Sequence, residues 1–429
     1  MKLNYGRTFL LGLGFLGVSA IWSIYGVFVP VFLKDKFHLS PFVLGFFLTL
    51  DNIAALLIQP PVGVWSDKIR TPIGRRMPFI LIGAPISALA FCFIPIAPIL
   101  PLFVLCTSTL LISMAAWRTP VVALVADVTP SPLRSQASAI ISFMGGVGAL
   151  IAYFGGARLS KINVAYPFWL GAVVVVIAAG LLLAFVREPK EADAQQVEVD
   201  TVQPGFWASL QIVCRDRSAF CMLLATFFLM FSYTAVEGAF TLYASSHLRL
   251  EEADSAVLLG VLSLVFIIFA LPSGNLGAKF GRRNTVMAGL VGMGASLLTI
   301  FVLPVSVLTR AVFKMQIPGV GAFAVTTVAL LLMFVGICWA LIIVHLLPML
   351  SDMTDNGHIG TYTGLYYLVT SMAAIAGPIV NGGIVQITNN YNNVMLLAPI
   401  ASFIAVALMT QVKKGEIISR KVEKESNSI

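Results

Sequence analysis

Three charged residues lie inside stretches of sequence that are otherwise apolar, and these residues are the best placed to do chemistry. Asp51, Arg118 and Glu237 each fall within a run long enough to cross a bilayer. Placing an ion at the centre of a membrane costs about 2.5–3.5 kcal/mol on insertion scales, so each needs a functional or structural reason. Asp51 lies ~15 Å from the outer end of its predicted helix, which is close to the midplane. Two acids and one base in these positions favour a role in moving protons across the membrane.

Asp51 is the principal candidate for a proton carrier. A membrane-embedded carboxyl can load and release a proton when desolvation favours its neutral form and a nearby cation favours its charged form. Glu237 is a second candidate, with two alternatives: a hydrogen bond that locks its helix, or solvation near the outer mouth. Arg118 can neutralise an acid that has lost its proton, donate hydrogen bonds to substrate hydroxyls, or form a static ion pair.

Aromatic faces, amides and hydroxyls in the same apolar runs are candidates to contact a hydroxyl-rich substrate. Aromatic residues in membrane helices are more often packing residues or part of the interfacial belt. Neighbouring helix positions point about 100° apart, so only one of Trp117 and Arg118 is expected to line a cavity. The candidates for substrate contact are Arg118, Trp117, Trp22, Tyr25, Asn52, Tyr233, Trp339, Tyr366 and Asn381.

The elements that position these residues follow from the composition. The chain has 429 residues, of which 59% are hydrophobic and 11% charged, whereas soluble domains carry about 25% charged residues. A soluble protein cannot hide this much apolar surface, which excludes a soluble enzyme and a nucleic-acid-binding protein. Spans of about 20 apolar residues are predicted at 8–33, 41–66, 78–98, 101–126, 136–157, 166–186, 219–245, 255–278, 284–304, 321–346, 359–387 and 392–411.

The predicted fold is an all-α membrane protein with 12 transmembrane helices in two six-helix halves. The halves are residues 1–186 and 219–411, with a polar cytoplasmic linker at 187–218 and a cytoplasmic tail at 412–429. Most of the 27 Lys and Arg residues fall in loops and termini that this topology places in the cytoplasm, as the positive-inside rule requires. The net charge of +8 is therefore a topology signal, and no nucleic-acid partner is expected.

Short motifs repeat in the two halves, roughly half the chain apart. The end of span two reads Gly63-Val64-Trp65-Ser66-Asp67-Lys68 and then Ile73-Gly74-Arg75-Arg76, and the end of span eight reads Gly274-Asn275-Leu276-Gly277-Ala278-Lys279-Phe280-Gly281-Arg282-Arg283. Asp127-Val128-Thr129 after span four has a counterpart in Asp352-Met353-Thr354 after span ten. Similar motifs at matching loops indicate a duplicated six-helix unit.

These motifs resemble the signature of the major facilitator superfamily, in which Gly, Asp and Gly-Arg-Arg close span two and are echoed in the second half. Ser66-Asp67, the run Gly74-Arg75-Arg76-Met77-Pro78-Phe79 and Asp51-Asn52 further resemble the branch of sucrose transporters and glycoside–pentoside–hexuronide cation symporters. The resemblance implies secondary active transport by alternating access, with a sugar or glycoside as substrate and a coupling cation.

The same motifs supply candidate gating residues, namely Asp67, Arg75, Arg76, Asp127, Arg282 and Arg283. Asp67 can lie against the N-terminus of span eleven, where exposed N–H groups favour a carboxylate. Separation of the halves would break that contact, as alternating access requires. The alternative is that the arginines only fix the topology. Ala278 replaces the acid in the second half, so the equivalent contact is expected to be weaker or missing there.

The sequence thus predicts a proton-coupled sugar or glycoside symporter in the cell membrane. Two alternatives within the superfamily are a proton-coupled drug or small-molecule antiporter and a sodium-coupled sugar symporter. An enzyme is not expected, because the sequence has no nucleotide-binding loop, metal-binding His-Glu-x-x-His motif or nucleophile elbow. No cofactor or metal is expected, and a monomer in the lipid bilayer is the default.

Overall fold

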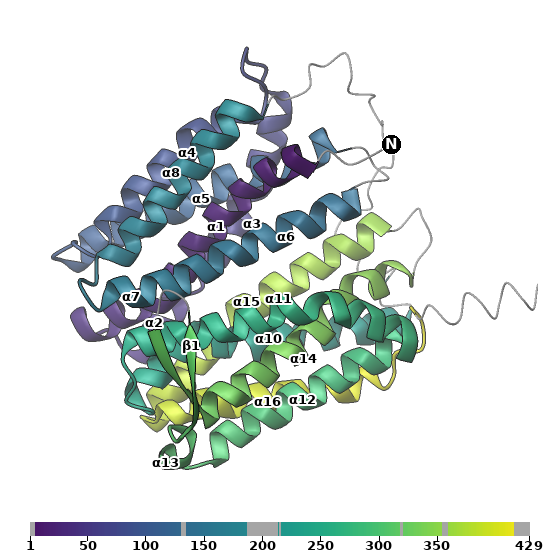
Figure 1. The fold of residues 1–429 in the computed structure, drawn as a ribbon. Coiled ribbons are helices and arrows are strands. Elements are labelled where there is room, and N and C mark those ends of the chain that lie inside the picture. The colour runs from purple at the N-terminus through teal and green to yellow at the C-terminus, as the bar shows by residue number, and fades with distance from the viewer. Residues whose placement is uncertain are drawn as a thin grey trace, which may run out of the picture.

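The computed structural model describes residues 5–129, 134–186, 213, 216–317, 321–353 and 359–415. Helices run side by side in two bundles, with the amino-terminal half above the carboxy-terminal half in Figure 1. The first half contains α1 (Tyr5–Val31), η1 (Phe32–Lys36), α2 (Pro41–Phe47), α3 (Leu50–Lys68), α4 (Met77–Phe93), α5 (Leu100–Val128), α6 (Arg134–Leu150), η3 (Ile151–Gly155), α7 (Gly156–Ser160) and α8 (Tyr166–Phe185).

The second half begins at α10, because the predicted linker lies mostly outside the described residues. It contains α10 (Arg217–Ser246), α11 (Glu252–Phe280), α12 (Arg282–Val302), α13 (Val305–Leu308), β1 (Ala311–Ile317), β2 (Gly321–Thr326), α14 (Thr327–Ser351), α15 (Ile359–Thr388), η5 (Tyr391–Asn393) and α16 (Val394–Met409). Within the described part of the chain, 11 helices are long and apolar enough to cross a membrane, and Met77–Phe93 is a shorter apolar helix. The predicted all-helical membrane fold is confirmed.

Several spans depart from the continuous α-helices that the sequence predicts. The predicted span 41–66 is interrupted after α2, where Thr49 Oγ1 donates to the Phe46 carbonyl at 2.7 Å. Spans one and five each contain a π-helical turn, η1 and η3. Such turns occur often at functional sites.

The prediction that span ten begins at residue 321 is wrong by six residues. Gly321–Thr326 is strand β2, which pairs with β1 in an antiparallel hairpin. The helix α14 begins only at Thr327, where the Thr326 hydroxyl accepts from Ala329 N–H. An apolar strand and the start of an apolar helix cannot be distinguished by hydropathy alone.

The halves meet at the end of the bundle that carries α2, α7 and the hairpin, called the outer end here because the charge bias places it outside the cytoplasm (Figure 1). The helices α2 and α15 cross at glycines. A Cβ atom on Gly45 would collide with the carbonyl oxygen of Pro378, and one on Gly382 would collide with that of Pro41. Lys34 reaches across to the Ser246 hydroxyl and lies over the Tyr391 ring.

The hydrophobic cores also show contact between the halves at the outer end. One core belongs to the second half alone, whereas the other combines the first half with Ala253, Ala256 and Val257 from the outer end of α11. Toward the opposite end, side chains of α3 and α11 are exposed, with Leu57 at 67% and Leu271 at 80%. The two halves are therefore packed together at the outer end of the bundle.

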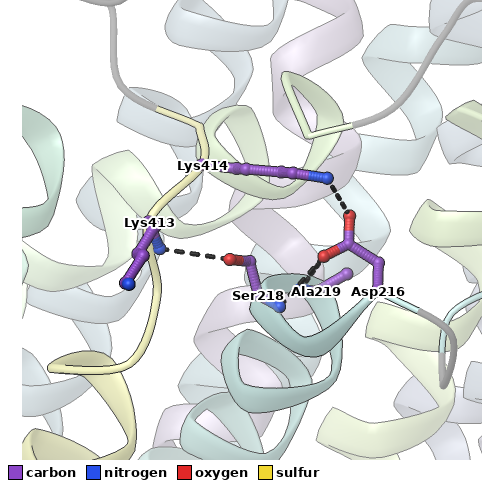
Figure 2. A network of polar contacts seen from close by, with 5 residues as sticks. All are labelled: Asp216, Ser218, Ala219, Lys413 and Lys414. Atoms are coloured by element: carbon purple, nitrogen blue, oxygen red, sulfur yellow. Dashed lines mark hydrogen bonds and ion pairs between the residues drawn. The ribbon is translucent and has the colours of Figure 1, made fainter.

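The end of α16 is fastened to the beginning of α10 (Figure 2). Asp216 caps α10 by accepting from the N–H groups of Ser218 and Ala219, and its carboxylate also pairs with Lys414 Nζ at 2.8 Å. The N–H of Lys413 donates to the Ser218 hydroxyl at 3.2 Å. These contacts join the first and last helices of the second half into one unit.

Candidate functional site

Asp51, Arg118 and Glu237 come together between the two halves. Asp51 in α3 is within electrostatic reach of Arg118 in α5 and of Glu237 in α10. Asp51 and Arg118 do not form a direct ion pair, and Asp51 instead accepts from Asn52 Nδ2 at 2.8 Å. Asp51 therefore lies between a guanidinium of its own half and a carboxylate of the other half.

Arg118 and Glu237 occupy an unusual environment. Protein atoms surround both side chains closely, yet both remain accessible to water. Side chains that line an internal cavity have this combination. A cavity also explains how ions persist in membrane-spanning helices, since water or substrate can solvate them.

Aromatic residues build the wall around Glu237. The Tyr233 hydroxyl, one helical turn earlier, donates to Glu237 Oε1 at 3.0 Å. The Tyr233 ring stacks on Trp339 of α14, with centroids 3.9 Å apart and planes 10° apart. The sequence predicted both residues as candidates, and the structure brings them together beside the acid.

On the amino-terminal side, Trp22 and Tyr25 of α1 lie close to Asp51. Their rings meet edge to face with centroids 5.7 Å apart, and Tyr25 is within electrostatic reach of Asp51. The Trp22 Nε1 and the Tyr25 hydroxyl are buried without a hydrogen-bond partner among the described residues. Buried polar groups normally have partners, so these two stand out as unsatisfied polar atoms on the α1 side of the site.

Tyr153 is a site residue that the sequence reasoning missed. It lies on the π-helical turn η3, within electrostatic reach of Glu237 and Tyr233 and within hydrogen-bonding reach of Ser23 in α1. Its position two residues before Gly155-Gly156, inside a predicted span, was the available signal.

Three predicted contact residues lie away from the cavity. Trp117 is 1% exposed, packs against Gly83 and donates from Nε1 to the Ser87 hydroxyl at 3.0 Å, so α5 turns Arg118 and not Trp117 toward the cavity. Asn381 is fully buried and donates to the Ala235 carbonyl at 2.7 Å, which joins α15 to α10. Tyr366 is buried within the core of the second half.

Some of the predicted gating residues lie outside the described part of the chain, and the others make contacts that the structure shows. The side chains of Asp67 and Asp127 lie outside the described residues, so their contacts stay predictions, as does a gating role for Arg75. Arg76 donates to the Ser66 hydroxyl at the end of α3. Arg282 pairs with Asp352 at 2.6 Å, and Arg283 donates to the carbonyls of Met409 and Thr410 at the end of α16. The second-half arginines thus hold helices of one half together.

Comparison with known protein families identifies the family to which this chain belongs. The sequence profile described as Major Facilitator Superfamily matches residues 11–331 and 222–426. This chain belongs to the Major Facilitator Superfamily. It is a multi-pass membrane protein and a secondary transporter of small molecules, not an enzyme.

Individual relatives within the superfamily differ in how much of the chain they match. Multidrug resistance protein 2 of Bacillus subtilis is 24% identical over 379 residues, which cover 88% of this chain and 87% of that protein. Sucrose transport protein SUT4 of Oryza sativa is 54% identical, but only over 41 residues, 10% of this chain and 6% of that protein. The crystal structure of the nucleoside transporter NupG has a TM-score of 0.72 at 16% identity and covers 95% of this chain and 100% of that chain.

The expected membership of the superfamily is thus confirmed, whereas the narrower resemblance to sucrose transporters is confined to a short segment. Over its full length, the chain matches a protein named for multidrug resistance. The likeness to NupG concerns the fold alone.

Proposed function

We propose that this protein is a proton-coupled antiporter of small apolar or cationic molecules. The observation that carries the proposal is the charge balance at the centre, where Asp51 lies within electrostatic reach of both Arg118 and Glu237. With both acids ionised, this group has a net charge of minus one. Either one proton or one monovalent organic cation would neutralise it, so the two would compete for the same site, as antiport requires.

The walls around the acids favour an apolar substrate. The stacked faces of Tyr233 and Trp339 lie beside Glu237. Aromatic faces attract organic cations, and the attraction amounts to about 0.5–2 kcal/mol. Arg118 would repel a cation if it stood alone, but Asp51 lies within electrostatic reach and offsets its charge. The full-length similarity to a multidrug resistance protein supports the same substrate class.

Proton-coupled sugar symport remains the second candidate. The Asp51–Asn52 pair and the guanidinium of Arg118 offer acceptors and donors that suit hydroxyl groups. The short segment shared with a sucrose transport protein points the same way. A sodium-coupled version of this symport would leave internal pH unchanged.

The direction of proton movement distinguishes these functions. The purified protein is placed in sodium-free liposomes with a pH-sensitive dye inside, and tetraphenylphosphonium or a panel of sugars is added outside. Antiport predicts that the interior becomes alkaline when tetraphenylphosphonium enters, whereas symport predicts that one sugar makes it acidic. Uptake of a radiolabelled sugar that occurs only after sodium is added, with no change in internal pH, would contradict proton coupling altogether.

Matched variants test whether the proton flux depends on Asp51 and Glu237. Glu237→Gln and Asp51→Asn should each abolish the proton flux driven by tetraphenylphosphonium, because neither amide can release a proton. Glu251→Gln is the control, since Glu251 is an exposed acid that precedes α11 at the outer end. An unchanged flux in both site variants would overturn the proposed coupling mechanism.

A further inference from the structure

A pocket extends from Glu237 into the carboxy-terminal half. It has an empty volume of about 520 Å³, part of which is open to solvent. The surrounding helices are α10, α11, α12 and α14, with one contribution from η3. Its lining residues include Tyr153, Tyr233, Glu237, Leu259, Leu262 and Leu332.

The pocket has one polar wall, and most of its remaining lining is apolar. Tyr153, Tyr233 and Glu237 interact with one another and form one wall. Most of the other lining side chains are aliphatic, and they include Met293, a residue type that adapts to ligands of different shape. Ser232 and Ser263 also line the pocket, and the Ser232 hydroxyl donates to the Ala398 carbonyl at 2.8 Å. The pocket is therefore suited to an apolar group attached to a polar or charged one.

Tyr153 covers this pocket from the other half of the protein. It is the one lining residue that comes from the described part of the amino-terminal half. The turn η3 packs closely on α11, where a Cβ atom built on Gly260 would lie only 2.9 Å from Tyr153 Cβ. Because the contact lies between the halves, any motion that separates their outer ends would remove Tyr153 from the pocket.

We propose that this pocket is a subsite for the apolar portion of a monocationic substrate, and that Tyr153 closes it from the amino-terminal half. The inference rests on the proposed function and extends it. The cationic group lies beside Glu237 and the aromatic stack, and its apolar substituent enters between α11 and α14. Substrate affinity then depends on the length of that substituent, by at most about fourfold for each methylene group that becomes buried.

A series of alkyltrimethylammonium ions with ethyl, butyl and hexyl chains tests the subsite. Binding to the purified full-length protein is measured by calorimetry, and the wild type should bind the hexyl ion at least tenfold more tightly than the ethyl ion. Leu262→Phe and Leu332→Phe each fill part of the pocket from a different helix. Both variants should bind the hexyl ion about tenfold more weakly and the ethyl ion within about twofold of the wild type.

Further variants distinguish an effect of the pocket from the effects of general hydrophobicity and misfolding. Leu271→Phe adds the same bulk to α11 at a side chain that is 80% exposed, and it should leave the whole series unchanged. Tyr153→Ala should release the hexyl ion about tenfold faster, whereas Tyr153→Phe keeps the covering ring and should release it at the wild-type rate. Retained affinity for the ethyl ion shows that each variant is folded.

The outcomes separate this inference from the proposed function. If chain length has the same effect in Leu262→Phe and Leu332→Phe as in the wild type, the subsite is wrong, while proton flux driven by tetraphenylphosphonium would still support antiport. If Tyr153→Ala releases the hexyl ion at the wild-type rate, the assignment of Tyr153 is wrong. If tetraphenylphosphonium drives no proton flux and no ammonium ion binds, both the function and the subsite are overturned.

Discussion

The ring of Tyr233 in α10 lies flat on the indole of Trp339 in α14, with centroids 3.9 Å apart and planes 10° apart. The stack holds the Tyr233 hydroxyl in place, and that hydroxyl donates to Glu237 at 3.0 Å. A group on α14 is thereby connected to the acid on α10. The aromatic pair and the carboxylate form a single surface on which a cation could bind.

The first prediction concerns this aromatic surface. Trp339→Ala should weaken the binding of tetraphenylphosphonium by about tenfold, because a cation–π contact contributes about 0.5–2 kcal/mol. Calorimetry on the purified protein measures the change. Trp169→Ala is the matched control, since Trp169 is 43% exposed on the surface of the other half. Equal affinities for Trp339→Ala and the control would remove Trp339 from the site.

The second prediction concerns the glycine crossing at the outer end. Gly45→Ala should separate α2 from α15, because the added methyl group would collide with the Pro378 carbonyl. Spin labels at Ile162 and Val302, both well exposed and in different halves, should then move farther apart in double electron–electron resonance. Gly180→Ala is the control, since no atom lies within 4 Å of its added Cβ. Unchanged distances in Gly45→Ala would show that the crossing does not limit closure.

The third prediction concerns Lys34, which joins the halves at the outer end. Its ammonium group donates to Ser246 and lies 4.7 Å from the centroid of Tyr391. Lys34→Met should lower the population of the closed outer end by about tenfold, because a hydrogen bond from a charged group contributes about 1.5–3 kcal/mol. The same spin-label pair reports the change.

Lys36→Met serves as the control for Lys34. Lys36 lies two residues away, but its ammonium group donates to the Ala97 carbonyl at 2.7 Å within its own half. Its removal should leave the distance between the halves unchanged. Identical distance distributions for the two variants would mean that the contacts of Lys34 do not stabilise closure.

The fourth prediction concerns the cap at the start of α10 (Figure 2). Burial by itself would raise the pKa of Asp216, but Lys414 and two backbone N–H groups together hold that pKa below its ordinary value. The stabilisation is complete above the unfolded-state pKa of about 3.9 and is lost as the pH falls through the lower folded-state pKa. Hydrogen bonding to Asp216 raises the pKa of Lys414. The stabilisation that depends on the charge of Lys414 is therefore complete below pH about 10.4 and is lost at higher pH.

Substitutions separate the two parts of this contact. Asp216→Ala should lower the free energy of unfolding by about 0.5–2 kcal/mol, because the helix cap is lost. Lys414→Gln should cost about 0.2–1 kcal/mol, because the lysine is largely exposed. Lys413→Gln is the control, since only the backbone N–H of Lys413 takes part. Thermal unfolding in detergent measures all three, and an Asp216→Ala protein as stable as Lys413→Gln would contradict the capping role.

The sequence alone was sufficient for the membrane fold, the order of the spans and the three charged residues within them. Hydropathy determines these features because a bilayer requires about 20 apolar residues per span and penalises each ion. The hairpin at β1 and β2 escaped this reasoning, since the mostly apolar strand β2 runs directly into the apolar helix α14. The narrower assignment to sugar symporters relied on short motifs, which relatives with other substrates can share.

Only the tertiary structure decided which side chains meet. Arg118 and Trp117 are neighbours in sequence, yet the rotation of α5 turns one toward the cavity and buries the other against α4. Asp51 and Glu237 become neighbours only because the two halves pack together at the outer end. Tyr153 joins them through a π-helical turn that no sequence pattern predicted. A linear sequence specifies the depth of each group in the membrane, but the packing of helices from both halves specifies its partners.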